Sequence, residues 1–288
     1  MAYRLTVWGA RGSIPTPGQQ TSRYGGNTAC VSVEIDGSGD RLVILDAGTG
    51  IRMLGKALAA SGTDALNADL LVTHTHWDHI QGLPFFAPGQ ASTVRIWGPK
   101  QGEVALERIL RDQMNPVVFP VPLDQLASEL AVHHVEPGTF EVDGFAVQAM
   151  RLRHPGVTLG YRLAPKGGGP DLAYITDNEL GTGGEYEVGS GWRKELEGFI
   201  ADADLMIHDT MYTEDELDTH RGWGHSSHVE AVRLAAEAGV KRLMLFHHRP
   251  ERDDASMDRF LDEARVEADK LSCAVEVMAA REGLQLTL

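Results

Sequence analysis

Three histidines and one aspartate fall within six residues of this chain, at His74, His76, Asp78 and His79. They directly follow the apolar run 68–73, which has the composition of a strand buried on both faces. Crowding such polar groups at the end of a buried strand is costly unless each finds a partner. Divalent metal ions supply such partners, because imidazole and carboxylate are common metal ligands. The motif therefore requires a fold that delivers metal ligands from the end of an internal strand.

Three later apolar runs end in the same way. His154, Asp177 and His247 follow the predicted strands 145–152, 172–176 and 243–246. Because carboxyl ends of neighbouring parallel strands meet at one edge of a sheet, these side chains are expected to converge. Asp46 follows the predicted strand 42–45, where it could accept the distal N–H of His79 or instead cap a following helix.

The remaining pattern mixes short strands with single amphipathic helices. Further strands are predicted at 5–8, 31–35, 94–97, 159–163 and 205–207, and helices at 51–60, 103–113, 227–238 and 256–271. No segment has the composition of a linker between independent domains. We therefore expect one domain, residues 1–288, with the α/β architecture of two mixed sheets packed face to face and helices outside, a four-layer αββα sandwich.

Composition narrows the class of protein further. The 288 residues are 42% hydrophobic and 23% charged, which is typical of a globular protein with a large core. A formal charge of −15 argues against a long nucleic-acid groove. No apolar stretch is long enough to span a bilayer and no signal-peptide pattern opens the sequence, so we expect a cytoplasmic protein with no membrane partner. Cys30 and Cys273 lie in apolar contexts and are expected to be buried free thiols.

The ordered set formed by the histidine motif, His154, Asp177 and His247 resembles the metallo-β-lactamase superfamily. The resemblance implies an αββα sandwich with two metal ions at one edge, zinc being preferred and manganese or iron the alternatives. His74, His76 and His154 would bind one metal, Asp78, His79 and His247 the other, and Asp177 would bridge them. Alignment with the family's final strand selects His247 over His248 as the ligand. A homodimer is suggested by the resemblance alone.

Two more motifs resemble the ribonuclease Z-like phosphodiesterase branch of this superfamily. They are Ile207-His-Asp-Thr and Gly224-His-Ser-Ser, and they imply that Asp209 orients His225 toward a substrate phosphate. The acid is Asp209 where tRNA-processing relatives carry Glu, and Ser226 or Ser227 alone would also explain a helix start here. We expect His225, Asp209 and Asp78 to form the catalytic set. No catalytic role is expected of His208, His220 and His228. His133 and His134 are expected to be ordinary strand residues.

The predicted chemistry is hydrolysis of a phosphodiester. A hydroxide bridging the two metals would attack, while His225 would protonate the leaving alkoxide. Relatives that mature tRNA carry a protruding arm between the third and fourth metal motifs, whereas only 22 residues separate His154 from Asp177 here. The predicted partner is therefore a small phosphodiester, with a 3′,5′-cyclic nucleotide as the first choice. Arg11 and Asn27, in segments resembling bacterial cyclic-nucleotide phosphodiesterase-like proteins, could line the mouth of the site.

Several alternatives stay open at this point. The same metal centre could hydrolyse a thioester, lactone or β-lactam, although the Asp209 and His225 pair and the presence of Asp177 in place of Cys count against this. A tRNA 3′-processing endonuclease without the usual arm is a second alternative. A redox protein would need an electron donor that no flavin-binding domain here supplies, and a non-catalytic binding module would be expected to have lost ligands.

Overall fold

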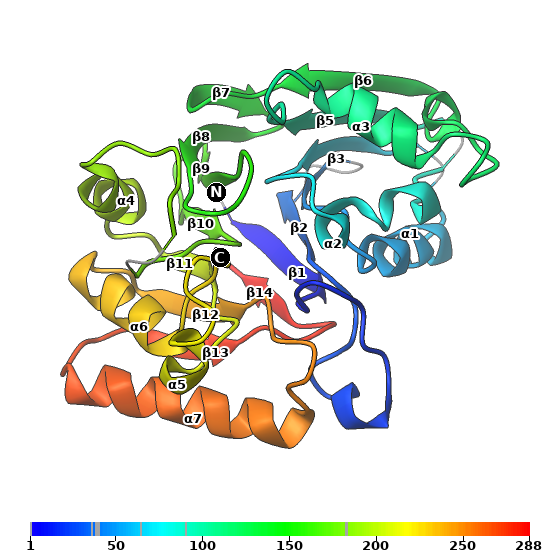
Figure 1. Cartoon of the computed structure of the whole chain (residues 1–288). Coiled ribbons are helices and arrows are strands. Elements are labelled where there is room, and N and C mark those ends of the chain that lie inside the picture. The colour runs from blue at the N-terminus through cyan, green and yellow to red at the C-terminus, as the bar shows by residue number, and fades with distance from the viewer. Residues whose placement is uncertain (1, 36, 38–40, 64, 90, 182–183) are drawn as a thin grey trace.

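Two mixed β-sheets pack against each other in the computed structural model, which describes residues 2–35, 37, 41–63, 65–89, 91–181 and 184–288. Helices cover the outer faces of both sheets (Figure 1). This is the predicted αββα sandwich, so that prediction is confirmed. Among the described residues no helix is long and apolar enough to cross a membrane.

The first sheet has the strand order β14-β1-β2-β3-β4-β5-β6. The neighbours from β3 to β6 are parallel, whereas β1 pairs antiparallel with both β14 and β2, as does β2 with β3. The strands are β1 (Tyr3–Gly9), β2 (Cys30–Ile35), β3 (Arg41–Leu45), β4 (Asn67–Leu71), β5 (Thr93–Gly98), β6 (Glu129–His134) and β14 (Gln285–Thr287).

The second sheet has the order β13-β12-β11-β10-β9-β8-β7. Strands β10 to β13 are parallel, and β7, β8, β9 and β10 pair antiparallel in succession. The strands are β7 (Gly138–Val142), β8 (Phe145–Arg151), β9 (Leu159–Pro165), β10 (Leu172–Ile175), β11 (Leu205–Asp209), β12 (Arg242–Phe246) and β13 (Glu276–Ala279).

The central core lies between the two sheets and includes Leu5, Leu45, Phe145 and Phe246, all fully buried. Each sheet also packs its outer face on helices, which is why the central strands are apolar on both sides. The first sheet carries α1 (Ile51–Ala60), α2 (Trp77–Ile80) and α3 (Leu106–Gln113), and the second carries α4 (Trp192–Ile200), α5 (Glu214–Leu217), α6 (His228–Glu237) and α7 (Asp254–Lys270). Single 3₁₀ turns lie at Gln19–Thr21, Leu83–Phe85 and Leu123–Gln125.

Helix α1 has the predicted bounds, and the predicted strands were found within a few residues. Helices α2, α4 and α5 and strands β7, β13 and β14 were not predicted, and β6 was predicted only through the expectation that His133 and His134 lie in a strand. Three of those strands lie at or near a sheet edge and are largely exposed, so they lack the apolar run that marks a buried strand. His133 and His134 lie in β6, as expected of ordinary strand residues. Both cysteines are free, but Cys273 is only half-buried because it follows the end of α7.

Candidate metal centre and active site

The histidine motif, Asp177 and His247 follow the parallel strands β4, β10 and β12, whereas His154 follows the antiparallel strand β8. Asp46, Asp177 and His247 follow β3, β10 and β12, and all three adopt left-handed backbone angles, with φ of 59°, 49° and 60°. This conformation costs about 1–3 kcal/mol for a residue with a side chain and is commonest at functional sites. The turn redirects the chain at the sheet edge, where the four ligand-bearing segments meet.

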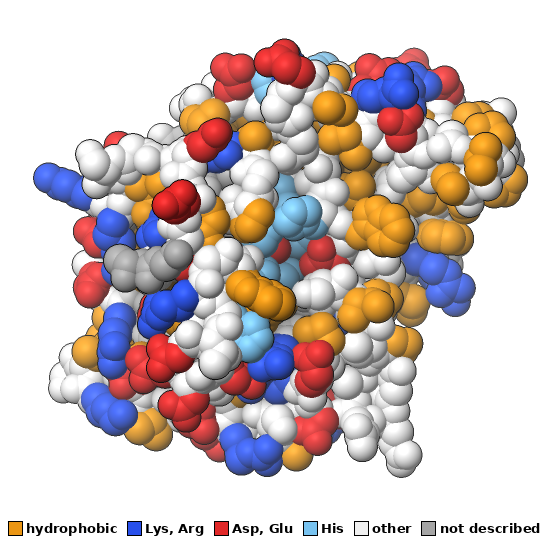
Figure 2. All heavy atoms as spheres, in the orientation of Figure 1, with side chains coloured by type: hydrophobic (Ala, Val, Ile, Leu, Met, Phe, Trp, Pro, Cys, Tyr) orange, Lys and Arg blue, Asp and Glu red, His pale blue; other side chains and the backbone are white. Residues whose placement is uncertain are grey.

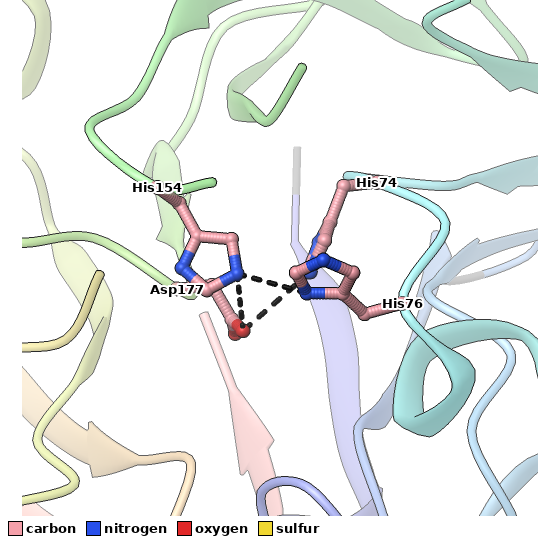
Figure 3. A group of neighbouring side chains, drawn as sticks. All are labelled: His74, His76, His154 and Asp177. Carbon is pink, nitrogen blue, oxygen red and sulfur yellow. Dashed lines mark hydrogen bonds and ion pairs between the residues drawn. The ribbon is translucent and has the colours of Figure 1, made fainter. Parts of the chain in front are cut away.

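The first cluster contains His74, His76, His154 and Asp177, whose potential ligand atoms all lie within 4.8 Å of one another. In Figure 3 the imidazoles of His74 and His76 face that of His154 above the Asp177 carboxylate. His154 Nε2 lies 3.0 Å from His76 Nδ1 and 3.6 Å from Asp177 Oδ2. The sequence assigned these residues to one metal and its bridge, and the fold brings them together.

The second cluster contains Asp78, His79, Asp177 and His247, again with all ligand atoms within 4.8 Å. His247 Nε2 lies 3.0 Å from Asp78 Oδ2 and 3.2 Å from Asp177 Oδ1. Asp177 thus presents one carboxylate oxygen to each cluster, as a bridging ligand would. His248, the neighbour of His247, turns away and donates from Nε2 to the carbonyl of Ala280 at 2.8 Å.

The donor set fits divalent cations. His74 Nε2 and His79 Nε2 are buried and, within the described part of the chain, have no hydrogen-bond partner, although both face the carboxylate of Asp177. Burial would lower the pKa of His79, but the charges of Asp177, Asp78 and Asp46 outweigh burial and raise it well above its usual value. The pKa of Asp177 lies well below its usual value because His247, His79 and His74 outweigh its burial. Positive charge at this position therefore stabilises the ionised carboxylates, and bound metal ions would provide such charge.

Asp46 orients His79, a member of the second cluster, through the ring nitrogen that faces away from the cluster. Its carboxylate accepts hydrogen bonds from His79 Nδ1 at 2.8 Å, from the backbone N–H of Thr73 at 2.8 Å and from the hydroxyl of Tyr174 at 3.0 Å. A proton on Nδ1 leaves Nε2 of His79 as the ligand atom. Helix α1 begins after Gly50 without a side-chain cap, so the capping interpretation of Asp46 is wrong.

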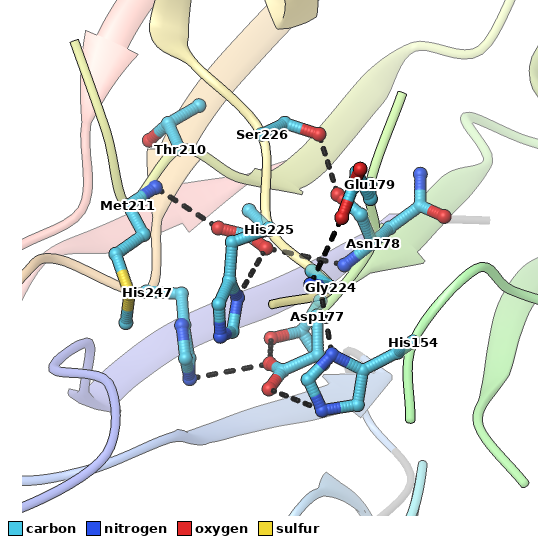
Figure 4. Close-up of polar contacts among 12 residues, drawn as sticks. His154, Asp177, Asn178, Glu179, Thr210, Met211, Gly224, His225, Ser226 and His247 are labelled. Carbon is cyan, nitrogen blue, oxygen red and sulfur yellow. Dashed lines mark hydrogen bonds and ion pairs between the residues drawn. The ribbon is translucent and has the colours of Figure 1, made fainter. Parts of the chain in front are cut away.

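A second His–Asp pair lies beside the clusters. Asp209, the last residue of β11, accepts the Nδ1–H of His225 at 2.8 Å, and both residues are buried. The His225 ring stacks on His247 with centroids 5.1 Å apart, and Figure 4 shows the two rings side by side. Burial lowers the pKa of His225, but the charge and hydrogen bond of Asp209 raise it to about 9. Helix α6 begins at His228, three residues after His225, with Ser227 as its cap, so the helix start and the His–Asp pair coexist.

The family model of the β-lactamase superfamily domain matches residues 41–248, a range that contains both clusters and the Asp209–His225 pair. The chain belongs to the β-lactamase superfamily. It is 27% identical to the ribonuclease Z of Thermoplasma acidophilum, with 92% of this chain and 91% of that protein covered. Such relatives place it in the ribonuclease Z-like branch of the superfamily.

Solved structures show the same fold. The metallo-β-lactamase fold protein YhfI from Bacillus subtilis superposes with a TM-score of 0.68 at 21% identity, covering 100% of this chain and 99% of that one. The short form of human tRNase Z gives a TM-score of 0.66 at 20% identity, covering 98% of each chain.

The opening Gly-Ala-Arg-Gly-Ser segment of this superfamily member serves the site differently from the prediction. Arg11 is fully buried and donates to the carbonyls of Gly25, Arg249 and Arg252, so it does not line the mouth. Asn27 likewise donates its side-chain N–H to Glu282. Arg11 thus anchors the chain segment after β12 and Asn27 bonds to the segment after β13, because buried guanidinium and amide groups need acceptors. The segment still reaches the site, since the backbone N–H of Ser13 donates to Asp78 Oδ2 at 2.7 Å.

Sequence analysis missed a buried carboxylate, Glu179, two residues after Asp177. Its Oε2 accepts from the Tyr186 hydroxyl at 2.6 Å and from the backbone N–H groups of Gly222 and Gly224 at 2.8 and 3.1 Å. The Gly224 carbonyl in turn accepts the Nδ1–H of His154 at 2.9 Å (Figure 4). Gly224 has a φ of +88°, and a Cβ there would overlap the His154 ring, so a side chain would not fit. The place of Glu179 just after a ligand was the signal that could have found it.

The remaining histidines lie outside both clusters. His208 is buried and its Nδ1 lies 2.6 Å from the Asp209 carbonyl. His220 stacks on Tyr212, and His228 packs against Phe260. On the face shown in Figure 2, histidine side chains gather in a central hollow, and hydrophobic side chains lie around it.

Proposed function

We propose that this chain is a metal-dependent phosphodiesterase that hydrolyses a small phosphodiester, with a 3′,5′-cyclic nucleotide as the preferred substrate. The observation that carries the proposal is the Asp209–His225 pair, which lies against both metal clusters. An acyl hydrolase on the same centre would have no need of this buried pair.

In the proposed assignment seven residues would hold two divalent ions, with zinc preferred and manganese or iron as the alternatives. His74, His76 and His154 hold one ion, Asp78, His79 and His247 hold the other, and Asp177 contacts both. Divalent ions bound there would neutralise the phosphoryl oxygens and make hydroxide available from water at neutral pH. Local positive charge of this kind lets a chain of net charge −15 accept an anionic diester.

His225 is the proposed general acid. Asp209 accepts the proton on Nδ1, which directs the second ring nitrogen, Nε2, toward the substrate side. A pKa of about 9 in the absence of metal keeps the ring protonated at neutral pH. The ring can therefore deliver a proton to the leaving alkoxide, a step worth about 10²–10⁴-fold in rate.

A small substrate is favoured by the short connection between the third and fourth ligand segments. Strands β9 and β10, of 7 and 4 residues, make up half of the 22 residues between His154 and Asp177 and are joined by residues 166–171. This leaves no length for a protruding arm that grips tRNA. A second candidate, an RNA endonuclease, is favoured by the identity to ribonucleases Z.

The test uses metal-loaded protein on five substrates: a 3′,5′-cyclic nucleotide, bis(p-nitrophenyl) phosphate, a precursor tRNA, a chromogenic lactam and a thioester. Each is measured before and after chelation and with zinc or manganese added back. Chelator-sensitive cleavage of the two small diesters alone is the expected result. Preferential cleavage of the precursor tRNA supports the endonuclease, and cleavage of the lactam or thioester with no diester turnover overturns phosphodiester hydrolysis.

A further inference from the structure

Two of the most exposed large apolar side chains of the described residues border the metal clusters. Trp77 is 76% exposed although its neighbours His76 and Asp78 belong to the clusters. Trp223 is 61% exposed and lies two residues before His225. An exposed indole beside a polar site is a recurrent feature of ligand-binding surfaces.

The two indoles come from opposite sides of the site. Trp77 opens α2 on the first sheet, whereas Trp223 lies between α5 and α6 on the second. Their segments meet at His154, whose ring centroid lies 4.9 Å from that of His76 and 5.1 Å from that of His225.

Among the described residues, no protein acceptor takes a hydrogen bond from either of these two indole N–H groups. The other three tryptophans each donate their indole N–H to a protein acceptor, in the pairs Trp8–Ser32, Trp97–Asp69 and Trp192–Arg151. Within the described residues no such hydrogen bond is formed by Trp77 or Trp223. Buried or structural tryptophans usually satisfy this donor, so the two exposed rings differ from the rest in kind.

Trp223 is nevertheless held in place by aromatic contacts. Its ring meets His220 edge to face, with centroids 5.0 Å apart. His220 stacks on Tyr212 at 4.6 Å, and Tyr212 lies 6.0 Å from His225. A rigid series of rings therefore runs from the proposed general acid to the exposed indole, which reduces the entropy lost when a ligand stacks there.

We propose that Trp77 and Trp223 form a rim that binds the nucleobase of the substrate by stacking. This inference rests on the proposed phosphodiesterase function. It adds the part of the site that would bind the base of a nucleotide substrate. An uncharged planar base binds to indole faces without needing basic side chains, and stacking tolerates any base. Metal ions bound by the two side-chain clusters would then hold the phosphate, while the rim binds the base.

The test compares binding of adenosine 5′-monophosphate and ribose 5-phosphate to metal-loaded protein by calorimetry. Both probes carry the same phosphate and sugar and neither is a diester, so turnover does not interfere. The variants are Trp77→Ala, Trp223→Ala and the two Trp→Phe replacements. Leu271→Ala is the control, because Leu271 is an exposed apolar residue at the end of α7.

The wild type should bind the nucleotide more tightly than the sugar phosphate. Each Trp→Ala variant should lose about 5–100-fold in affinity for the nucleotide and none for the sugar phosphate, with Phe retaining part of the affinity. Equal affinity of the wild type for both probes, or equal losses for both probes in the variants, overturns the inference. If nucleotide preference depends on the indoles but no diester is cleaved, the base site stands and the proposed reaction fails.

Discussion

Asp209 joins His225 to the segment that carries Asp177. One oxygen of its carboxylate, Oδ2, accepts the His225 Nδ1–H at 2.8 Å and the backbone N–H of Asn178 at 3.1 Å. Asn178 directly follows Asp177, the residue shared by both clusters. The Asp209 carboxylate therefore positions the proposed general acid relative to the candidate metal centre. Substitutions at His225 and Asp209 can test how much this pair contributes to the rate.

Replacing His225 by Ala should lower the rate by about 10²–10⁴-fold for a cyclic nucleotide, whose leaving alkoxide needs a proton. The loss should be much smaller for bis(p-nitrophenyl) phosphate, because p-nitrophenolate leaves without protonation. Steady-state kinetics on both substrates measure the difference, and metal content by elemental analysis should stay unchanged. Equal losses on the two substrates would contradict the general-acid role.

The pH profile should report the charge of Asp209. His225 acts as an acid only when protonated, so kcat falls as pH rises through its pKa, which burial lowers but Asp209 raises to about 9 in the metal-free protein. Bound cations repel the imidazolium and move this alkaline limb to lower pH. Asp209→Asn keeps an acceptor for Nδ1 but removes the charge, so the limb should move lower still. An unchanged limb in kcat against pH would sink this explanation.

Asp46→Asn should weaken metal binding by about 10–100-fold, because a neutral amide orients and polarises His79 less well. Competition with a chromogenic chelator measures the affinity. Tyr174→Phe is the matched control, since it removes one donor to the same carboxylate and leaves its charge and the His79 contact intact. The Phe variant should lose less affinity than the Asn variant, and the reverse order would argue against orientation by Asp46.

Glu179→Ala should lower kcat more than it raises KM, because the loop that carries Gly224 and His225 loses its anchor. Two backbone N–H groups lose their acceptor, so the free energy of unfolding should fall by about 1–3 kcal/mol or more. Urea denaturation and kinetics give both quantities. Tyr186→Phe removes only the hydroxyl contact and should keep kcat near the wild-type value. A variant at Glu179 that loses stability but keeps kcat would reduce this residue to a structural role.

Local signals in the sequence were enough to predict the sandwich and the residues of both clusters. His74 to His79 lie on one short segment, and His154, Asp177 and His247 each follow an apolar run, so the chemistry of each ligand is encoded beside the strand that delivers it. Parallel strands bring the histidine motif, Asp177 and His247 to one edge for a general geometric reason, whereas His154 reaches the same edge from the antiparallel strand β8.

Contacts between distant segments were decided only in the tertiary structure. Arg11 was expected at the mouth of the site, yet it is buried because the carbonyls of Arg249 and Arg252 come to it from the far end of the chain. Asp46 meets Tyr174 across the core and Glu179 meets Gly224, although no local pattern links either pair. A hydrogen bond depends on where two atoms lie in space, and the sequence alone determined which side chains could bind, while the packing of the sheets determined which of them meet.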